Sequence, residues 1–138
     1  MTFFNEVYDR FLSLITDHQF LSFTEEELEQ ELESKLRSAL SKIPTFDHLK
    51  MNPYTQSFSI SLSELELTIL AHAMLAEWMS QKVYNVQHMK NHMASKDFTI
   101  FSNANHLKEM MNLQAYAQKE VLYLIGQYNL ANLMKSVK

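Results

Sequence analysis

The feature that most constrains this fold is the scarcity of residues that interrupt helices. The chain has one glycine, Gly126, and two prolines, Pro44 and Pro53, in 138 residues. Because tight turns and loops draw heavily on glycine and proline, so few of them leave room mainly for helices. Hydrophobic residues make up 46% of the chain, which is enough for a buried core. We therefore predict an all-α fold, a compact bundle of about five helices with a long final helix.

Length and charge limit the classes of function. A chain of this length forms one domain, which we divide into N-terminal helices with a long connection (1–60), core helices (61–130) and a flexible polar tail (131–138). The net charge of −4 argues against a partner held mainly through phosphates. No uncharged run approaches the roughly 20 residues that span a bilayer, and the first residues lack the basic segment of a secretory signal. We expect no membrane association, and the absence of cysteine fits a reducing cytoplasm.

Apolar spacing and capping residues place the helices. Thr24 with Glu27, and Ser63 with Glu66, are Ser/Thr-x-x-Glu capping boxes, which open a second and a third helix. The predicted helices run from about 3 to 17, from 24 to just before Pro44, from 63 to near Trp78, from 84 to 94, and from about 104 to 130.

Two stretches alternate polar and apolar residues in the manner of half-buried strands. They lie around residues 57–61 and 97–101, and their period of two is that of a β-strand. Since a lone strand needs a partner, the two either pair in one small β ribbon or each pair with a neighbouring subunit.

Two groups of residues share some features of metal sites. His88 and His92 lie four residues apart on one helical face, the spacing of a metal-binding pair. No glutamate follows the first histidine and no third ligand is predictable, so we expect a solvated or interfacial pair. The acidic run at 25–33 mostly avoids the leucine stripe of its helix and contains no Glu-x-x-His motif, which favours a solvated face. No catalytic triad or glycine-rich loop is evident, so we predict no metal, no cofactor and no enzymatic activity.

Methionine and tyrosine are frequent on the last helix. Its predicted length of roughly 40 Å, at ~1.5 Å per residue, exceeds what the core of so small a chain needs. Met-rich surfaces also suit partner helices. We therefore expect part of this helix to contact another chain. The candidate interface residues are Met110, Met111, Tyr123, Tyr128, Leu130, Leu133 and Met134.

Two segments of the second half resemble a known family. They are residues 62–78, LSELELTILAHAMLAEW, and residues 96–109, KDFTIFSNANHLKE. With the helix lengths around them, over roughly residues 60–128, they are similar to small virion neck proteins of tailed phages that infect Gram-positive bacteria. The resemblance implies a helical head–tail connector, or adaptor. Such proteins form a homo-oligomeric ring, commonly of twelve copies, beneath the portal and extend the DNA channel towards the tail.

The same resemblance implies partners and a location. The partners are the phage portal protein and the next neck or tail-completion protein, and DNA passes through the ring without sequence-specific binding. The location is the virion neck, after synthesis in the host cytoplasm. The alternative that the residues leave open is a free helical protein-binding or regulatory module, of phage or bacterial origin, which uses the Met and Tyr surface of the last helix.

Overall fold

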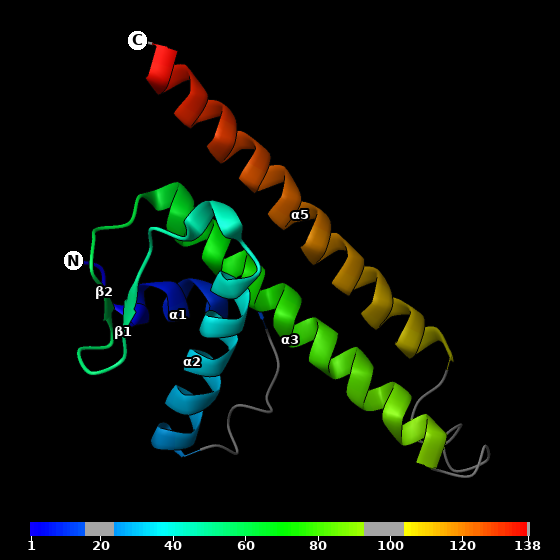
Figure 1. The fold of residues 1–138 in the computed structure, drawn as a ribbon. Coiled ribbons are helices and arrows are strands. Elements are labelled where there is room, and N and C mark those ends of the chain that lie inside the picture. Colours follow the sequence, from blue (N-terminus) through cyan, green and yellow to red (C-terminus); the bar gives the residue numbers. More distant parts are fainter. Residues whose placement is uncertain (16–23, 93–103, 138) are drawn as a thin grey trace.

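The structure, a computed structural model, describes residues 1–15, 24–92 and 104–137, and the side chains of these except 85–92, 104–107 and 136–137. Its elements are α1 (Phe4–Ser13), α2 (Glu25–Ser41), the 3-10 helix η2 (Pro44–Phe46), β1 (Met51–Asn52), β2 (Ser57–Phe58), α3 (Glu64–His92) and α5 (Ala104–Val137) (Figure 1). The prediction of an all-α fold with a long final helix and one small β ribbon is confirmed.

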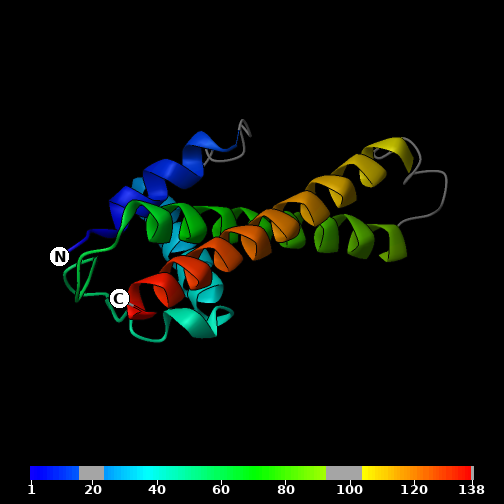
Figure 2. The ribbon, with the colours of Figure 1, turned by 90° about the horizontal axis from the view of Figure 1, so that it is seen from above.

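Helix α3 is the centre of the fold. Helices α1, α2 and α5 all pack against it. Figures 1 and 2 show α5 running back along α3, with α1 and α2 grouped around the first half of α3. The last turns of α3 and the first turns of α5 lie side by side, away from α1 and α2. The side chains of Ile69, Leu70 and Met74 are completely buried. A helix that is apolar on so much of its surface is buried on several sides, which is why α3 takes the central place.

Helix α3 is also longer than predicted. It runs without a break from Glu64 to His92, so the two helices expected from 63 to near Trp78 and from 84 to 94 are one over the described residues. No glycine or proline interrupts this stretch, and Val83 extends the buried face by packing with Met79 and Met110. The prediction of a separate helix over 84–94 is therefore wrong. The described residues contain four α-helices.

The β ribbon has a different partner from the predicted one. Residues 57–58 pair antiparallel with residues 51–52, in the register Met51 with Phe58 and Asn52 with Ser57. On its other side β2 meets the start of the chain, where Phe3 bridges to Ser57 and the Phe58 amide donates to the Thr2 carbonyl at 2.8 Å. Both edges of β2 are thus occupied within the protomer. The predicted pairing of this strand with residues 97–101 is therefore wrong, and its partners are β1 and the start of the chain. Residues 97–101 lie outside the described residues.

Aromatic rings fill the core beneath the ribbon. The Phe4 ring meets the Phe58 ring edge-on with centroids 5.1 Å apart, and Phe11 meets Trp78 in the same way at 6.5 Å. Phe4, Phe11 and Phe58 are completely buried, so α1 is fixed between the ribbon and α3. Helix α1 ends at Ser13, earlier than the predicted end near residue 17, and residues 16–23 lie outside the described residues.

Helix α5 extends beyond its predicted end. It continues past residue 130 to Val137, and 34 residues at 1.5 Å each give a length of about 51 Å. Residues 131–137 are helical, so the flexible tail predicted over 131–138 is corrected for these residues. The reason lies in the local sequence, because Ala131, Leu133 and Met134 favour helix and no proline or glycine follows Gly126.

Both predicted helix starts are present. The Thr24 hydroxyl accepts a hydrogen bond from the Glu27 amide at 3.1 Å. At the start of α3 the Glu66 amide donates to the Ser63 hydroxyl at 3.2 Å, and the Ser63 amide donates to the Glu66 carboxylate at 2.8 Å. This reciprocal pair satisfies two amides that have no partner inside the helix.

We predict that Thr24→Ala lowers the free energy of unfolding by about 1 kcal/mol, because it removes the side-chain acceptor at the start of α2. Urea denaturation of the full chain measures the change. Ser34→Ala, at an exposed position in the middle of the same helix, is the matched control and changes stability by no more than about 0.5 kcal/mol. Equal effects of the two substitutions would contradict the role of the cap.

Candidate functional site

Helix α5 has one face that packs against the rest of the protomer. Met110, Ala117 and Tyr128 are buried on it, at spacings of seven and eleven residues that return to the same side of a helix. The Gln114 side chain adds a hydrogen bond to the Ser80 hydroxyl at 2.9 Å. This inner face fixes which side of α5 points outwards.

Tyr128 anchors the inner face. Its hydroxyl donates to the Glu66 carboxylate at 3.0 Å, and its ring meets the Phe46 ring edge-on with centroids 5.1 Å apart. His48 approaches the same Glu66 oxygen at 3.3 Å. Glu66 therefore joins the start of α3, the connection before β1 and the second half of α5.

Glu66 is a buried carboxylate with enough partners to stay charged. Only 7% of Glu66 is exposed. Burial by itself raises the pKa of the carboxyl, but hydrogen bonds from Ser63, Tyr128 and His48 outweigh it and hold the pKa below the ordinary value of 4.5. Burial also raises the pKa of the Tyr128 phenol, with opposition from a hydrogen bond to Asn132 and reinforcement from Glu66. The shifts favour Glu66 as the carboxylate and Tyr128 as the phenol, so the phenol can donate its hydrogen bond to the carboxylate.

The position of Tyr128 and Met110 corrects part of the predicted interface. Both are candidate interface residues by sequence, yet Tyr128 is 9% exposed and Met110 is 6% exposed within a single protomer. Met110 packs with Met79 and Val83. The sequence does not separate these residues from the exposed ones because α5 carries apolar side chains around most of its circumference.

The other candidates lie on the outside of α5. Met111, Tyr123, Leu130, Leu133 and Met134 are between 45% and 62% exposed. Tyr116, which sequence analysis missed, is 63% exposed and precedes Tyr123 by seven residues, as Tyr123 precedes Leu130. That heptad spacing keeps the three on one side of the helix, and it is the signal that could have identified Tyr116. We call Tyr116, Tyr123, Leu130, Leu133 and Met134 the outer stripe.

An apolar groove opens beside α5. It has a volume of about 570 Å³ and lies between the end of α1, the middle of α3 and the first half of α5. Its lining residues are Leu14, Ile15, His72, Leu75, Trp78, Met79, Lys82, Met110, Leu113 and Tyr116. The Lys82 ammonium lies 4.3 Å from the centre of the Trp78 ring, which places a positive charge on the Trp78 side of an otherwise mainly apolar groove. We call this the Trp78 groove. It was not predicted, because it forms from three segments distant in sequence.

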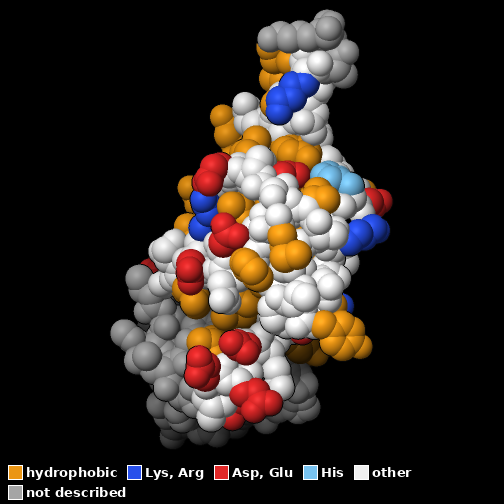
Figure 3. Space-filling view, turned by 90° about the vertical axis from the view of Figure 1, so that its left-hand side faces the viewer, with side chains coloured by type: hydrophobic (Ala, Val, Ile, Leu, Met, Phe, Trp, Pro, Cys, Tyr) orange, Lys and Arg blue, Asp and Glu red, His pale blue; other side chains and the backbone are white. Residues whose placement is uncertain are grey.

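Acidic side chains gather at the start of α2. Glu25, Glu26, Glu27 and Glu29 are exposed, whereas Glu31 pairs with Lys35 at 2.7 Å and Glu33 with Arg37 at 3.8 Å. Figure 3 shows acidic side chains at the lower end of the molecule, where α2 begins in Figure 1, and hydrophobic side chains on the end of α5 that stands above the rest. The acidic side chains at the start of α2 thus lie at the opposite end of the molecule from the projecting end of α5.

The predicted histidine pair lies near the end of α3. His88 and His92 are on the last two turns of α3, and their side chains lie outside the described residues. Among the described residues, three or more His, Asp or Glu side chains nowhere converge as metal ligands would. None of the helices in the described part of the chain combines the length and apolar character needed to cross a bilayer.

Comparison of the chain with models of protein families, with curated proteins and with solved structures gives no match.

We predict that Tyr128→Phe lowers the free energy of unfolding by about 1.5–3 kcal/mol, the usual contribution of a hydrogen bond to a charged group. The ring and its contact with Phe46 remain, so the loss reports the hydroxyl alone. Tyr123→Phe, five residues away on the exposed side of α5, is the control and leaves stability within about 0.5 kcal/mol of the parent. A loss of similar size in both variants would show that the Glu66 bond is not the cause.

A second prediction concerns pH. Because the pKa of Glu66 is lower in the folded protein than in the unfolded chain, the unfolded chain takes up the proton first as pH falls. The stabilisation from Glu66 is therefore complete above the ordinary value of 4.5 and is lost as pH falls below it. Glu66→Gln does not titrate, so the stability difference between the parent and this variant shrinks with acidification. Urea denaturation at neutral pH and below pH 4.5 measures it, and a constant difference would refute the assignment.

Proposed function

We propose that this chain is a virion structural protein, a head–tail connector or adaptor that forms a ring beneath the phage portal and extends the DNA channel towards the tail. The observation that carries the proposal is the outer stripe of α5. Apolar side chains that remain exposed in a row along a helix are characteristic of protein interfaces. The resemblance of residues 62–78 and 96–109 to neck proteins of tailed phages gives the interface its assignment.

A ring needs two different surfaces on each subunit. In a closed cyclic ring with head-to-tail contacts, one patch of each copy meets another patch of the next. The protomer has an exposed outer stripe on α5 and an acidic start of α2, and the two lie at different places in the fold. This supports a homo-oligomeric ring, with twelve copies as the number implied by the resemblance.

The end of α5 supports contact with a further protein. Residues 129–135 are all exposed, and Figure 1 shows this end of α5 projecting past the rest of the fold. Its apolar residues Leu130, Leu133 and Met134 follow the i, i+3, i+4 pattern with which a helix docks into a groove. The partner of this end is the portal protein, and the next neck or tail-completion protein lies on the other side of the ring.

The net charge of −4 fits a channel through which DNA passes without sequence-specific binding, because an acidic protein gains little from phosphate contacts. No cofactor and no catalytic step belong to this function. The protein acts in the virion neck after it is made in the host cytoplasm.

The Trp78 groove favours a second candidate, a free helical protein-binding or regulatory module. An apolar groove of about 570 Å³ with an aromatic side chain could take the apolar face of a partner helix. This candidate requires a partner that occupies the groove and a protein that works outside the virion.

We predict that the tagged chain co-sediments with DNA-filled, tail-less heads from an infected lysate. Quantitative mass spectrometry is expected to give about a dozen copies per head, the number that the resemblance implies for a closed ring. Heads that lack the portal are the control. Failure to bind portal-bearing heads would overturn the connector function and leave the binding module as the leading candidate.

A variant links this binding to the end of α5. Leu130→Asp places a charge on the outer stripe and is expected to abolish binding to heads, while circular dichroism and thermal unfolding remain those of the parent. Tyr54→Asp, at a position that is 96% exposed in the β1–β2 turn, is the matched control and binds normally. Normal binding by Leu130→Asp would separate the outer stripe from the function.

A further inference from the structure

The one glycine of this chain lies inside its longest helix, where the protomer does not need it. Gly126 is within α5 and is exposed. A methyl group on its Cα would meet no other segment of the protomer within 4 Å, and its φ is not positive. Because glycine is among the least favourable residues inside a helix, an alanine here would suit the single copy better. A packing reason for Gly126 therefore lies outside the protomer.

Gly126 lies at the centre of the side of α5 that faces away from α3. It follows the buried Ala117 by nine residues, which is half a turn around the helix axis after two full turns. Large apolar side chains flank it about one turn away on both sides. Leu122 precedes it by four residues and is 70% exposed, and Leu130 follows it by four residues and is 52% exposed. The row from Leu122 to Leu130 is thus an i±4 ridge of the helix surface with a notch in its middle.

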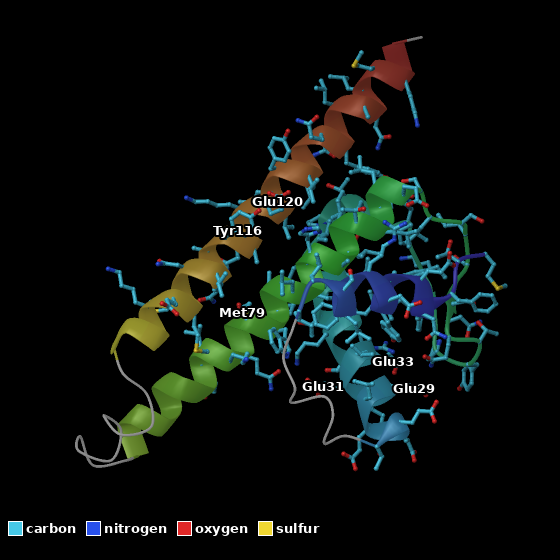
Figure 4. The ribbon with its side chains drawn as sticks, turned by 180° about the vertical axis from the view of Figure 1, so that it is seen from behind. Glu29, Glu31, Glu33, Met79, Tyr116 and Glu120 are labelled. Carbon is cyan, nitrogen blue, oxygen red and sulfur yellow. The ribbon has the colours of Figure 1, made fainter. Side chains whose placement is uncertain are left out.

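The surface around the notch is apolar and uncovered. Tyr123 and Leu133, three residues before and seven residues after Gly126, are also more than half exposed. Figure 4 shows Glu29 of α2 on one side of the molecule and Tyr116 of α5 on the other, with α3 between them. The outward side of α5 is therefore open to a second molecule.

A notch between two large apolar side chains fits the backbone of another helix. Where the residue at a helix crossing has no side chain, the two backbones approach closely and the flanking side chains reach past each other. Small residues at the crossing point allow the closest helix pairs. The geometry of Gly126 therefore indicates a helix as the occupant.

We infer that this helix is the α5 of a second copy of the chain, which crosses antiparallel at Gly126 about a two-fold axis. In such a pair, a residue that precedes Gly126 on one copy lies beside the residue that follows Gly126 by the same number on the other copy. Leu122 of each copy therefore packs beside Leu130 of the other, and glycine meets glycine on the axis. The equal spacing of the two leucines around the notch makes this surface complementary to itself, which is the reason that the occupant is a second copy.

The one charge close to the notch is compatible with the pair. Lys119 lies seven residues before Gly126, so it faces Leu133 of the other copy, about one turn from the end of α5 at Val137. The carbonyl end of a helix is partially negative and attracts a cation, and the lysine stem can lie along the leucine. The two Lys119 ammonium groups are about 21 Å apart along the pair, well beyond the Debye length of about 8 Å.

The other charges of α5 lie outside the contact. Glu109 and Glu120 are about 100° and 120° around the axis from Gly126, and Lys135 is half a turn away from it. Lys108 shares the side of Gly126 but lies about 27 Å before it, whereas α5 of the other copy extends only about 17 Å in that direction. Like charges therefore do not meet along α5 in the pair.

The contact is small and hence reversible. One face of a helix buries less than the ~1,200 Å² at which stable specific interfaces begin, so the copies pair at high concentration and separate on dilution. This inference goes beyond the proposed function and applies equally to a connector and to a free binding module. Because the pair covers Tyr123, Leu130 and Leu133 of the outer stripe, a chain in the pair cannot use these side chains to bind heads.

A leucine in the notch distinguishes the pair from a surface that is merely sticky. Gly126→Leu adds apolar area at a point where the protomer has open space, so non-specific association increases, whereas a helix pair that crosses at this point weakens. We expect sedimentation velocity of the full-length chain to show a concentration-dependent dimer, and Gly126→Leu to raise its dissociation constant at least tenfold. Asn112→Leu, exposed on the same side of α5 but beyond the contact, is the matched control and leaves the dissociation constant within about twofold.

A cysteine in the notch tests the two-fold axis, because the chain has no cysteine of its own. In the antiparallel pair, the two copies of Gly126→Cys come within the Cα–Cα limit of about 7 Å for a disulfide. Mild oxidation at a concentration where the parent pairs is expected to link them. The thiols of Asn112→Cys are about 42 Å apart in the same pair, so this control gives a several-fold lower yield.

The results decide the contact without the use of heads. A parent chain that stays monomeric at its highest soluble concentration overturns it, and so does a Gly126→Leu dimer as strong as that of the parent. Equal disulfide yields from Gly126→Cys and Asn112→Cys also overturn it, since they indicate a parallel pair or random collision. Circular dichroism at a concentration where the parent is monomeric checks that Gly126→Leu keeps its helices. Because the head-binding assay is separate, the contact and the connector function stand or fail independently.

Discussion

The docking of α5 on α3 is the contact on which the rest of the structure depends. It buries the inner face of α5 and places a single carboxylate, Glu66, where three segments meet. An ionised group that is 7% exposed is tolerated only when its hydrogen-bonding capacity is filled. Ser63, His48 and Tyr128 fill it, so the start of α3, the connection and α5 are tied through one side chain.

The same docking decides which surfaces are left for partners. Helix α5 can bury only one face on α3, yet it has apolar side chains on other faces as well. A helix that is hydrophobic around its circumference is normally buried on all sides. The tyrosines and leucines of the outer stripe therefore stay exposed in the protomer, and the inner face sets the direction in which they point. The buried and the exposed apolar residues of α5 are two consequences of one sequence pattern.

Local features were predictable from the sequence and non-local ones were not. The capping boxes predicted at Thr24 and Ser63 involve residues three apart, so the sequence alone identifies both caps. The structure has the reciprocal box at Ser63 and the hydroxyl cap at Thr24. The partner of β2 could not be identified from the sequence, because residues 51–52 have no alternating pattern. The other edge of β2 is taken by Thr2 and Phe3, which are more than fifty residues away at the start of the chain. Likewise, Met110 and Met111 are neighbours of one type, and only the packing of α5 on α3 buries the first and exposes the second. The Trp78 groove could not be predicted from the sequence either, because its lining comes from three segments that only the fold brings together.

The ion pairs of the protomer show how α5 differs from the other helices. Arg10 with Glu64 joins α1 to α3, and Lys42 with Glu77 joins α2 to α3 at 2.6 Å. Among the described residues no ion pair includes α5, which is held by apolar packing and by hydrogen bonds such as that of Tyr128. Salt therefore weakens the docking of α5 on α3 less than it weakens the exposed ion pairs that α1 and α2 make with α3.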